Sequence, residues 1–180
     1  GDLVRSTEHL GVAYISAYLK QKGYSCKIIE VYGMNDTQHI DEVLSEKYDI
    51  VGFTTTCVNM KPILDMAKIV KDAYEDSHIT LGGHMATFWD KAILERYPQV
   101  DSIVRGEGEI TTYELVEAIE EHKSFGEIDG LSYRDSVQIC QNPDRALIEN
   151  LDDLPFPVRD QFALHDNRAQ YLRICSSRGC

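Results

Sequence analysis

The sequence contains no run of basic residues and no apolar run long enough to cross a membrane. Its 180 residues include 30 acidic residues against 18 lysines and arginines, which gives a formal net charge of −12. Proteins that bind nucleic-acid phosphates rely on clustered Lys and Arg, so this charge argues against such a partner. A membrane-spanning helix needs about 20 consecutive apolar residues, and neither such a run nor a signal-peptide pattern is visible. We therefore expect a cytoplasmic protein with no nucleic acid and no membrane as partner.

The cysteines and histidines also show few spacings that are typical of metal ligands. Of the five cysteines, Cys26, Cys57 and Cys140 stand far from any other cysteine, in apolar or strand-like contexts. Such residues are typical of buried, reduced thiols in a cytosolic protein. The six histidines show no spacing typical of a metal site, and the expected role of each is a solvated or capping one. Only Cys180, which directly follows Arg178-Gly179, has a context that suggests a metal.

A phosphate-binding glycine-rich loop is missing from the start of the chain. A flavodoxin-like or other nucleotide-binding domain would carry that loop after its first strand, at or before residues 1–7. No glycine-rich sequence occurs there. A nucleotide-binding domain therefore ranks last among the function classes that we consider.

The part of the chain up to about residue 122 alternates between helical and strand-like patterns. Helical periodicity predicts helices at 8–22, 38–47, 60–74, 86–96 and 109–122, and short apolar runs predict strands at 25–31, 49–53, 78–81 and 101–104. This alternation with short connections favours the α/β class, with a doubly wound, mostly parallel sheet of the Rossmann or flavodoxin-like kind. The strand that normally precedes the first helix is either a stub at 1–5 or missing.

The pattern changes after residue 125. Two short segments, 130–134 and 136–140, predict a small β-hairpin, and two prolines stiffen the extended linker that follows. We therefore divide the chain into an α/β domain (1–125), a β-hairpin appendage (126–140), an interdomain linker (141–170) and a final strand-like segment (171–180).

Small and polar residues gather where three of the predicted strands end, which is where ligands of doubly wound sheets bind. Threonine hydroxyls can bond a ligand's amides or cap a helix, glycines allow close approach to the backbone, and carboxylates can accept hydrogen bonds from ribose hydroxyls. Helix capping, a tight turn and a solvated turn are the respective structural alternatives. The three loops are Thr54-Thr55-Thr56 with Asn59 as a further cap, Gly82-Gly83-His84, and Arg105-Gly106-Glu107-Gly108-Glu109.

Taken together, these residues resemble the cobalamin-binding domain that precedes the radical domain in cobalamin-dependent radical S-adenosylmethionine enzymes. Each motif is weak alone, and their order and spacing make the joint match specific. The matching segments are 8–19, 49–54, 82–87, 104–109, 130–134, 151–157 and 177–180.

The resemblance implies a binding site and a cofactor. Cobalamin would contact the strand-end loops and the start of the first helix, through Glu8, His9, Leu10, Gly11, Thr54, Thr55, Thr56, Asn59, Gly82, Gly83, His84, Gly106, Glu107 and Gly108. The family's cobalt-ligating motif, Asp-x-His-x-x-Gly, is replaced here by Ser6 and Glu8 when aligned on Gly11, so no histidine is expected on cobalt. Cys180 would be the first cysteine of the CxxxCxxC motif that holds a 4Fe–4S cluster, and 171–180 the first strand of a radical S-adenosylmethionine barrel.

The activity implied for the whole enzyme is methylation of an unactivated carbon, with the cluster, S-adenosylmethionine and cobalamin as cofactors. The chain would be the front part of that enzyme, inactive by itself, with its own radical domain and a small-molecule substrate as partners. Two alternatives stay open. One is a relative of the anaerobic magnesium-porphyrin ester cyclase, and the other is a domain that has lost cobalamin and serves docking or substrate recognition.

Overall fold

The computed structural model describes residues 9–31, 37–136, 138–159, 175 and 177–178 of the chain. The helices and strands, in chain order, are α1 (Leu10–Gln21), α2 (Thr37–Val43), β1 (Ile50–Thr54), α3 (Met60–Ala73), β2 (His78–Gly82), α4 (His84–Arg96), β3 (Ser102–Val104), α5 (Gly108–Glu120), β4 (Leu131–Arg134), β5 (Ile139–Gln141) and the 3-10 helix η2 (Leu151–Asp153).

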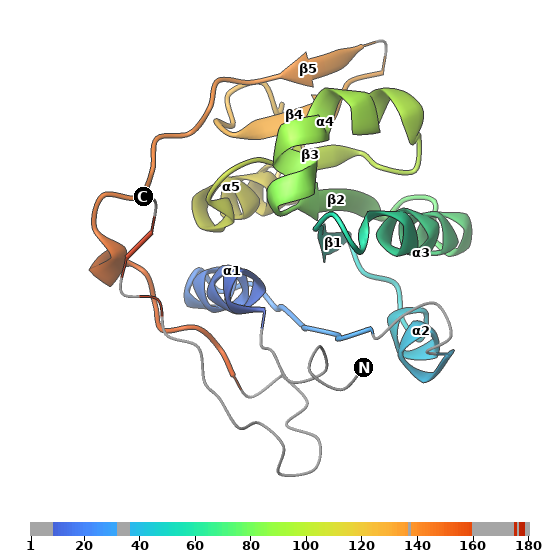
Figure 1. The fold of residues 1–180 in the computed structure, drawn as a ribbon, viewed down its shortest axis with the longest axis horizontal. Helices are drawn as coiled ribbons and strands as arrows, with labels where there is room; N and C mark the ends of the chain where they lie inside the picture. Colours follow the sequence, from blue (N-terminus) through green and yellow to red (C-terminus); the bar gives the residue numbers. More distant parts are fainter. Residues whose placement is uncertain (1–8, 32–36, 137, 160–174, 176, 179–180) are drawn as a thin grey trace.

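The five strands form one mixed sheet whose spatial order is also the chain order (Figure 1). β1, β2 and β3 are parallel, and they are joined by α3 and α4. β3 then pairs antiparallel with β4, and β4 with β5. The predicted α/β sheet is thus confirmed. The hairpin predicted after residue 125 also forms, and it extends the parallel strands instead of standing apart from them.

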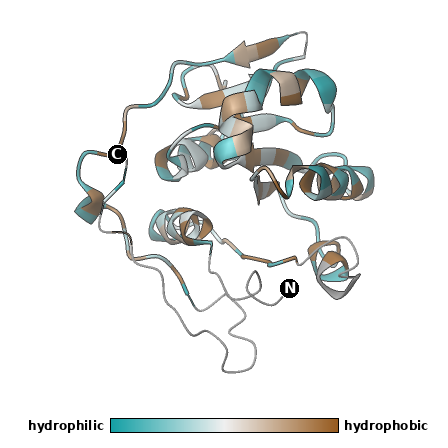
Figure 2. Cartoon of the chain, in the orientation of Figure 1, coloured by the Kyte–Doolittle hydropathy of each residue, from teal (hydrophilic) through white to brown (hydrophobic). Residues whose placement is uncertain are grey.

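Helices cover both faces of the parallel strands, as a doubly wound sheet requires. On one face Leu81 and Ile103 pack with Leu94 of α4 and Leu64 of α3. On the opposite face Val104 packs with α5. The strands carry many hydrophobic residues in Figure 2, and the helices mix hydrophobic and hydrophilic residues along their lengths. The core therefore lies in two layers, one on each side of the sheet.

Two predicted elements are wrong in type or length. Residues 25–31 form no strand of the described sheet. Ile29 and Val31, both partly buried, pack against the cluster around α2 and α3. The helix predicted at 38–47 ends at Val43. The hydroxyl of Ser45 donates to the carbonyl of Glu42 at 2.7 Å, a local bond that competes with further helical turns.

After β5 the chain runs as an extended linker along α5 towards α1 (Figure 1). The backbone N–H of Val158 donates to the carbonyl of Ala13 in α1, at 3.3 Å. The linker is therefore attached to the first helix of the α/β domain. No helix in the described part of the chain is both long and apolar enough to span a bilayer.

Candidate functional site

The loop between β2 and α4 lies at the carboxyl edge of the parallel strands and turns on Gly83. The φ of Gly83 is 89° and its ψ 175°, a conformation that essentially only glycine adopts. A Cβ atom at this position would lie 2.5 Å from the carbonyl oxygen of Thr55 and 2.9 Å from its nitrogen. The glycine is therefore required by the close approach of two strand-end loops.

Thr55 ties these two loops together. Its hydroxyl donates to the carbonyl of Gly82 at 2.7 Å and accepts from the N–H of Ala86 at 2.9 Å, while its own N–H donates to Gly82 at 2.8 Å. The side chain is fully buried. The role of Thr55 is thus to hold the edge together, and its hydroxyl is not available to a ligand.

The flanking threonines differ from Thr55. Asn59 closes their loop, because its amide oxygen accepts from the N–H of Thr56 at 2.6 Å and its amide nitrogen donates to the carbonyl of Thr54 at 3.2 Å. Both threonines are half-buried. Among the described residues, neither the Thr54 nor the Thr56 hydroxyl has a hydrogen-bond partner, so these two groups are free to bind a ligand.

A face of small residues runs inward from this edge. The register of the strands places Gly52 beside Thr80, Thr54 beside Gly82, and Thr80 beside Ser102, all pointing to the α5 side of the sheet. Gly52 is exposed although it lies in the middle of β1, and a Cβ atom there would meet only Thr80, at 3.5 Å. The sheet is therefore not covered at this point by the described residues.

Ser16 adds an unsatisfied polar atom to the same side of the domain. It lies on the buried face of α1 with Ala13 and Ala17, and it is 1% exposed. Its hydroxyl has no hydrogen-bond partner among the described residues. A buried hydroxyl without a partner costs free energy, about 1–3 kcal/mol, unless a ligand or water completes it.

The loop between β3 and α5 contains one residue with open surface and two that make contacts within the domain. Gly106, with a φ of 69°, is exposed and has open space around it. The carboxylate of Glu107 accepts from the N–H of Ile148 in the linker, at 2.7 Å. A Cβ atom at Gly108 would lie 2.9 Å from Ile15 of α1, so Gly108 permits the close packing of α1 on α5. Of the three residues of this loop that were predicted to contact the cofactor, only Gly106 presents open surface.

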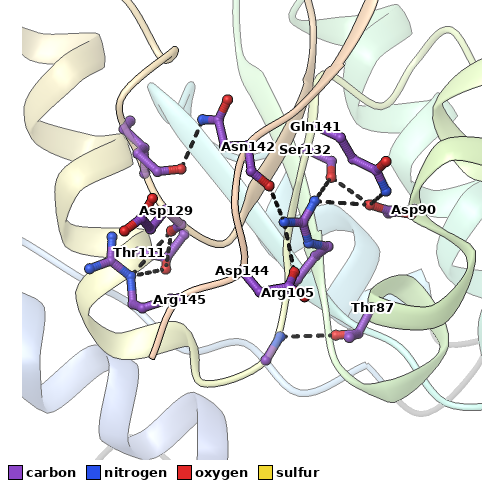
Figure 3. A network of polar contacts seen from close by, with 12 residues as sticks. Thr87, Asp90, Arg105, Thr111, Asp129, Ser132, Gln141, Asn142, Asp144 and Arg145 are labelled. Atoms are coloured by element: carbon purple, nitrogen blue, oxygen red, sulfur yellow. Dashed lines mark hydrogen bonds and ion pairs between the residues drawn. The ribbon is translucent and has the colours of Figure 1, made fainter. Parts of the chain in front are cut away.

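Arg105, the first residue of this loop, anchors it to α4 and to the hairpin (Figure 3). It forms a buried ion pair with Asp90 of α4 at 3.2 Å and also bonds the Ser132 hydroxyl and the Asn142 carbonyl. Burial by itself raises the pKa of Asp90, but hydrogen bonds from Ser132, Gln141 and Arg105 together hold that pKa below its ordinary value. The network joins α4, the end of β3 and the hairpin into one rigid support.

Large apolar side chains are exposed around the same edge. Val58 in the loop after β1 is 85% exposed, and Phe88 and Trp89 in α4 are 77% and 58% exposed. Trp89 also interrupts the helical conformation of α4, with φ −122° and ψ 21°. The sequence patterns did not single out these residues, Ser16 or Gly52, although an isolated glycine in an apolar strand is a known signal of close approach.

The structure describes some of the remaining predicted site residues. His9 is exposed at the N-terminus of α1, where its side chain makes no capping bond, and Leu10 and Gly11 follow in the first turn. His84 is exposed at the start of α4. Glu8 and Cys180 lie outside the described residues. Within the described ranges, no group of three or more His, Cys, Asp or Glu side chains could hold a metal ion.

Comparison with known proteins identifies the fold and the family. Residues 3–116 match the B12 binding domain family. An uncharacterised methyltransferase of Pyrococcus horikoshii is 32% identical over 95% of this chain and 38% of its own length. The anaerobic magnesium-protoporphyrin IX monomethyl ester cyclase of Rubrivivax gelatinosus is 32% identical over 78% of this chain and 27% of its own length. The chain thus spans well under half of each of these relatives.

A solved structure shares the fold. The cobalamin-dependent S-adenosylmethionine radical enzyme OxsB, with aqua-cobalamin and S-adenosylmethionine bound, superposes with a TM-score of 0.70 and 22% identity, over 87% of this chain and 22% of that one. Because the family match spans more than half of the chain, the chain belongs to the B12 binding domain family.

Proposed function

We propose that this chain binds cobalamin across the carboxyl edge of its sheet and serves as the cobalamin module of a cytoplasmic radical S-adenosylmethionine enzyme. The observation that carries the proposal is the buried, unpartnered hydroxyl of Ser16, in a domain whose small-residue sheet face is left open at Gly52. An enclosed polar atom and an uncovered strand are what a domain would keep for an inserted ligand.

The residues present fit this cofactor. Gly82 and Gly83 would border the cofactor with their backbone, and Gly52 leaves the sheet uncovered by the described residues beside them. The hydroxyls of Thr54 and Thr56 are available to amide groups, and the exposed apolar side chains at the edge can cover a macrocycle. Gly106 would leave room beside β3. When bound, cobalamin would supply a transferable methyl group, and a radical generated at a cluster of the partner domain would activate the substrate carbon.

The other predicted contacts have separate roles. Thr55, Asn59 and Glu107 would act indirectly, because their polar atoms hold the loops in place. Glu8, His9, Leu10 and Gly11 would contact cobalamin, with no histidine on cobalt, as the sequence suggests. Cys180 would ligate the 4Fe–4S cluster, and the radical domain and a small-molecule substrate would be the partners.

A domain that has lost its cofactor is less well supported. It would fill the edge with bulky side chains over Gly82 and Gly83. The small-residue face of the sheet is instead uncovered by the described residues at Gly52, where an added Cβ would meet only Thr80, at 3.5 Å.

The test is retention of hydroxocobalamin by the 180-residue chain, followed by gel filtration and a visible spectrum of the protein peak. We expect corrinoid to co-elute, with a spectrum that lacks a histidine-ligated signature. Gly52→Val would fill the open face and lower the affinity at least about tenfold. Gly126→Val, at an exposed glycine outside the site, is the matched control and should bind normally. Failure of the full-length protein to bind any corrinoid under reducing conditions would refute the proposal.

A second activity is favoured by one comparison, the 32% identity to the cyclase of Rubrivivax gelatinosus. A cyclase and a methyltransferase would use the same cofactor module with different chemistry. Isotope transfer from labelled S-adenosylmethionine methyl into product, by the full-length enzyme, would identify a methyltransferase. Ring closure of a magnesium-porphyrin ester without label incorporation would identify a cyclase.

A further inference from the structure

A buried carboxylate in the first turn of α5 is paired with an arginine from the far end of the chain. The Glu109 side chain is 3% exposed, and its Oε1 atom lies 2.6 Å from a terminal nitrogen of Arg178. A charge this deeply buried is costly unless a cation completes it. Among the described residues, Arg178 is the cation that does so.

Arg178 is held on two further sides. Its other terminal nitrogen lies 3.5 Å from Oε1 of Glu107, and its guanidinium carbon lies 4.8 Å from the ring centroid of Tyr14 in α1. A planar guanidinium suits such a site, because it can bond two carboxylates and stack on an aromatic ring at once. We call Glu107, Glu109 and Tyr14 the arginine seat.

One residue of the arginine seat, Glu107, lies in the loop between β3 and α5 that borders the proposed cofactor edge. Glu107 follows Gly106, and its second carboxylate oxygen binds the N–H of Ile148. The loop therefore holds the chain at two places, 41 and 71 residues further on. Two peptide bonds separate Arg178 from Cys180, so their Cα atoms can be no more than about 7 Å apart.

We propose that the arginine seat docks Arg178 and thereby positions the segment leading to Cys180 against the cofactor end of the sheet. Arg178 and Glu109 are positioning residues in this proposal. The purpose assigned to the docking rests on the proposed function, since it would set the cluster-bearing segment relative to the corrinoid. The docking itself can be tested independently of any cofactor.

The first experiment measures how often Arg178 leaves the arginine seat, with trypsin as the probe. Trypsin must take the Arg178 side chain into its own pocket before it can release Gly179-Cys180. In the native 180-residue chain, we expect Glu109→Gln to raise the initial rate of this cleavage at least about tenfold, because cleavage follows the population of the undocked state. The product is quantified by intact mass.

Two controls make the result specific. Glu114→Gln breaks another carboxylate–arginine pair on α5, that of Glu114 with Arg145, and should leave the rate unchanged. Cleavage after Lys123, in the exposed segment that follows α5, reports general loosening within each sample. Equal Arg178 cleavage in wild type, Glu109→Gln and Glu114→Gln would overturn the docking.

A second variant covers the case in which Glu109→Gln unfolds the domain and accelerates both cleavages. Arg178→Lys keeps a trypsin site and a charge but loses the planar fork, and it lies outside the folded core. We expect its cleavage to be several-fold faster than that of wild type, with Lys123 unaffected. An unchanged rate would contradict the docking geometry.

The positioning role is tested in the full-length enzyme with its cluster and cobalamin. We expect Arg178→Gln to retain corrinoid within about twofold and to lose most S-adenosylmethionine cleavage, with partial rescue by Arg178→Lys. Unchanged cleavage in Arg178→Gln would refute the positioning role. Absence of corrinoid from the wild-type enzyme would instead refute the proposed function and leave the trypsin result standing.

Discussion

The two ends of the parallel strands are completed in different ways. At the amino end, Lys71 bonds Asp101 at 2.9 Å and the carbonyl of Ser77 at 2.9 Å, and Asp101 accepts from the N–H of Ile79 at 2.7 Å. His78 shares a hydrogen bond with Ser102 at 2.8 Å. These polar groups all find partners within the domain.

The carboxyl end is left incomplete by comparison. The hydroxyls of Thr54 and Thr56 have no partner among the described residues, Gly106 faces open space, and large apolar side chains stand exposed nearby. Under the proposed function, the amino end contributes to stability, whereas the carboxyl end also keeps polar atoms for the cofactor. Substitutions at the two ends should therefore separate the free energy of unfolding from corrinoid affinity.

The largest effect is expected from Gly83→Ala at the carboxyl end. The added Cβ would collide with the backbone of Thr55 and the φ of 89° would be strained, at a combined cost of about 3–5 kcal/mol. We expect a matching loss in urea unfolding and no retained corrinoid. Gly126→Ala is the control, and a stable Gly83→Ala variant would show that this loop can relax.

The next effect is expected at the amino end, from Asp101→Ala. It removes the carboxylate that pairs with Lys71 and accepts from the Ile79 N–H, at a cost of about 2–3 kcal/mol. Corrinoid affinity, measured by titration at a temperature where the variant stays folded, should remain within about twofold of wild type. A large loss of affinity would contradict the proposal that the amino end of the sheet affects stability but not corrinoid binding.

The pH dependence of stability tests His78 at the same end. Burial, with a smaller contribution from Lys71 and against the opposing effect of Asp101, lowers the pKa of His78 to about 4. Because the unfolded histidine binds a proton near pH 6.5, its contribution to stability is present above that pH and is lost as the pH falls towards 4. We expect a loss of about 2 kcal/mol between pH 7 and pH 5.

The measurement is urea unfolding at both pH values for wild type and His78→Gln. The variant cannot titrate at this position, so its stability should change less over the interval. Parallel curves for the two proteins would mean that His78 does not carry the dependence.

The smallest effect on stability is expected from Thr54→Val. Since this hydroxyl has no partner among the described residues, the free energy of unfolding should change by less than about 0.5 kcal/mol. Corrinoid affinity should nevertheless fall about threefold to tenfold, which titration followed by gel filtration would detect. Thr55→Val is the matched contrast, because its hydroxyl makes two hydrogen bonds and its loss should destabilise the fold.

Local patterns were sufficient for most of the fold. The periodicity of α3, the apolar run of β2 and the Gly82-Gly83 pair each carry their signal within a few residues. Residues 25–31 were predicted as a strand from a short apolar run, but Ile29 and Val31 of this run pack against the cluster around α2 and α3, and a short apolar run alone does not distinguish such packing from strand pairing.

The site was less predictable because its contacts join distant parts of the chain. Gly108 was assigned to the cofactor, yet the structure places it against Ile15 of α1. Glu109 was considered as a carboxylate that could accept hydrogen bonds from a ligand, and its pairing with Arg178 was missed because the two residues lie 69 positions apart. Whether the hydroxyl of Ser16 is satisfied likewise depends on tertiary packing, which no local motif encodes.

Trp89 gives this domain an optical property. It is the one tryptophan among the 180 residues, and this residue is 58% exposed in the helix that starts beside Gly83. Corrinoids absorb light in the region where indole emits, so energy transfer to a corrinoid bound at this edge would quench the tryptophan emission of the whole domain. The intrinsic fluorescence of the chain would then report occupancy directly, without a label.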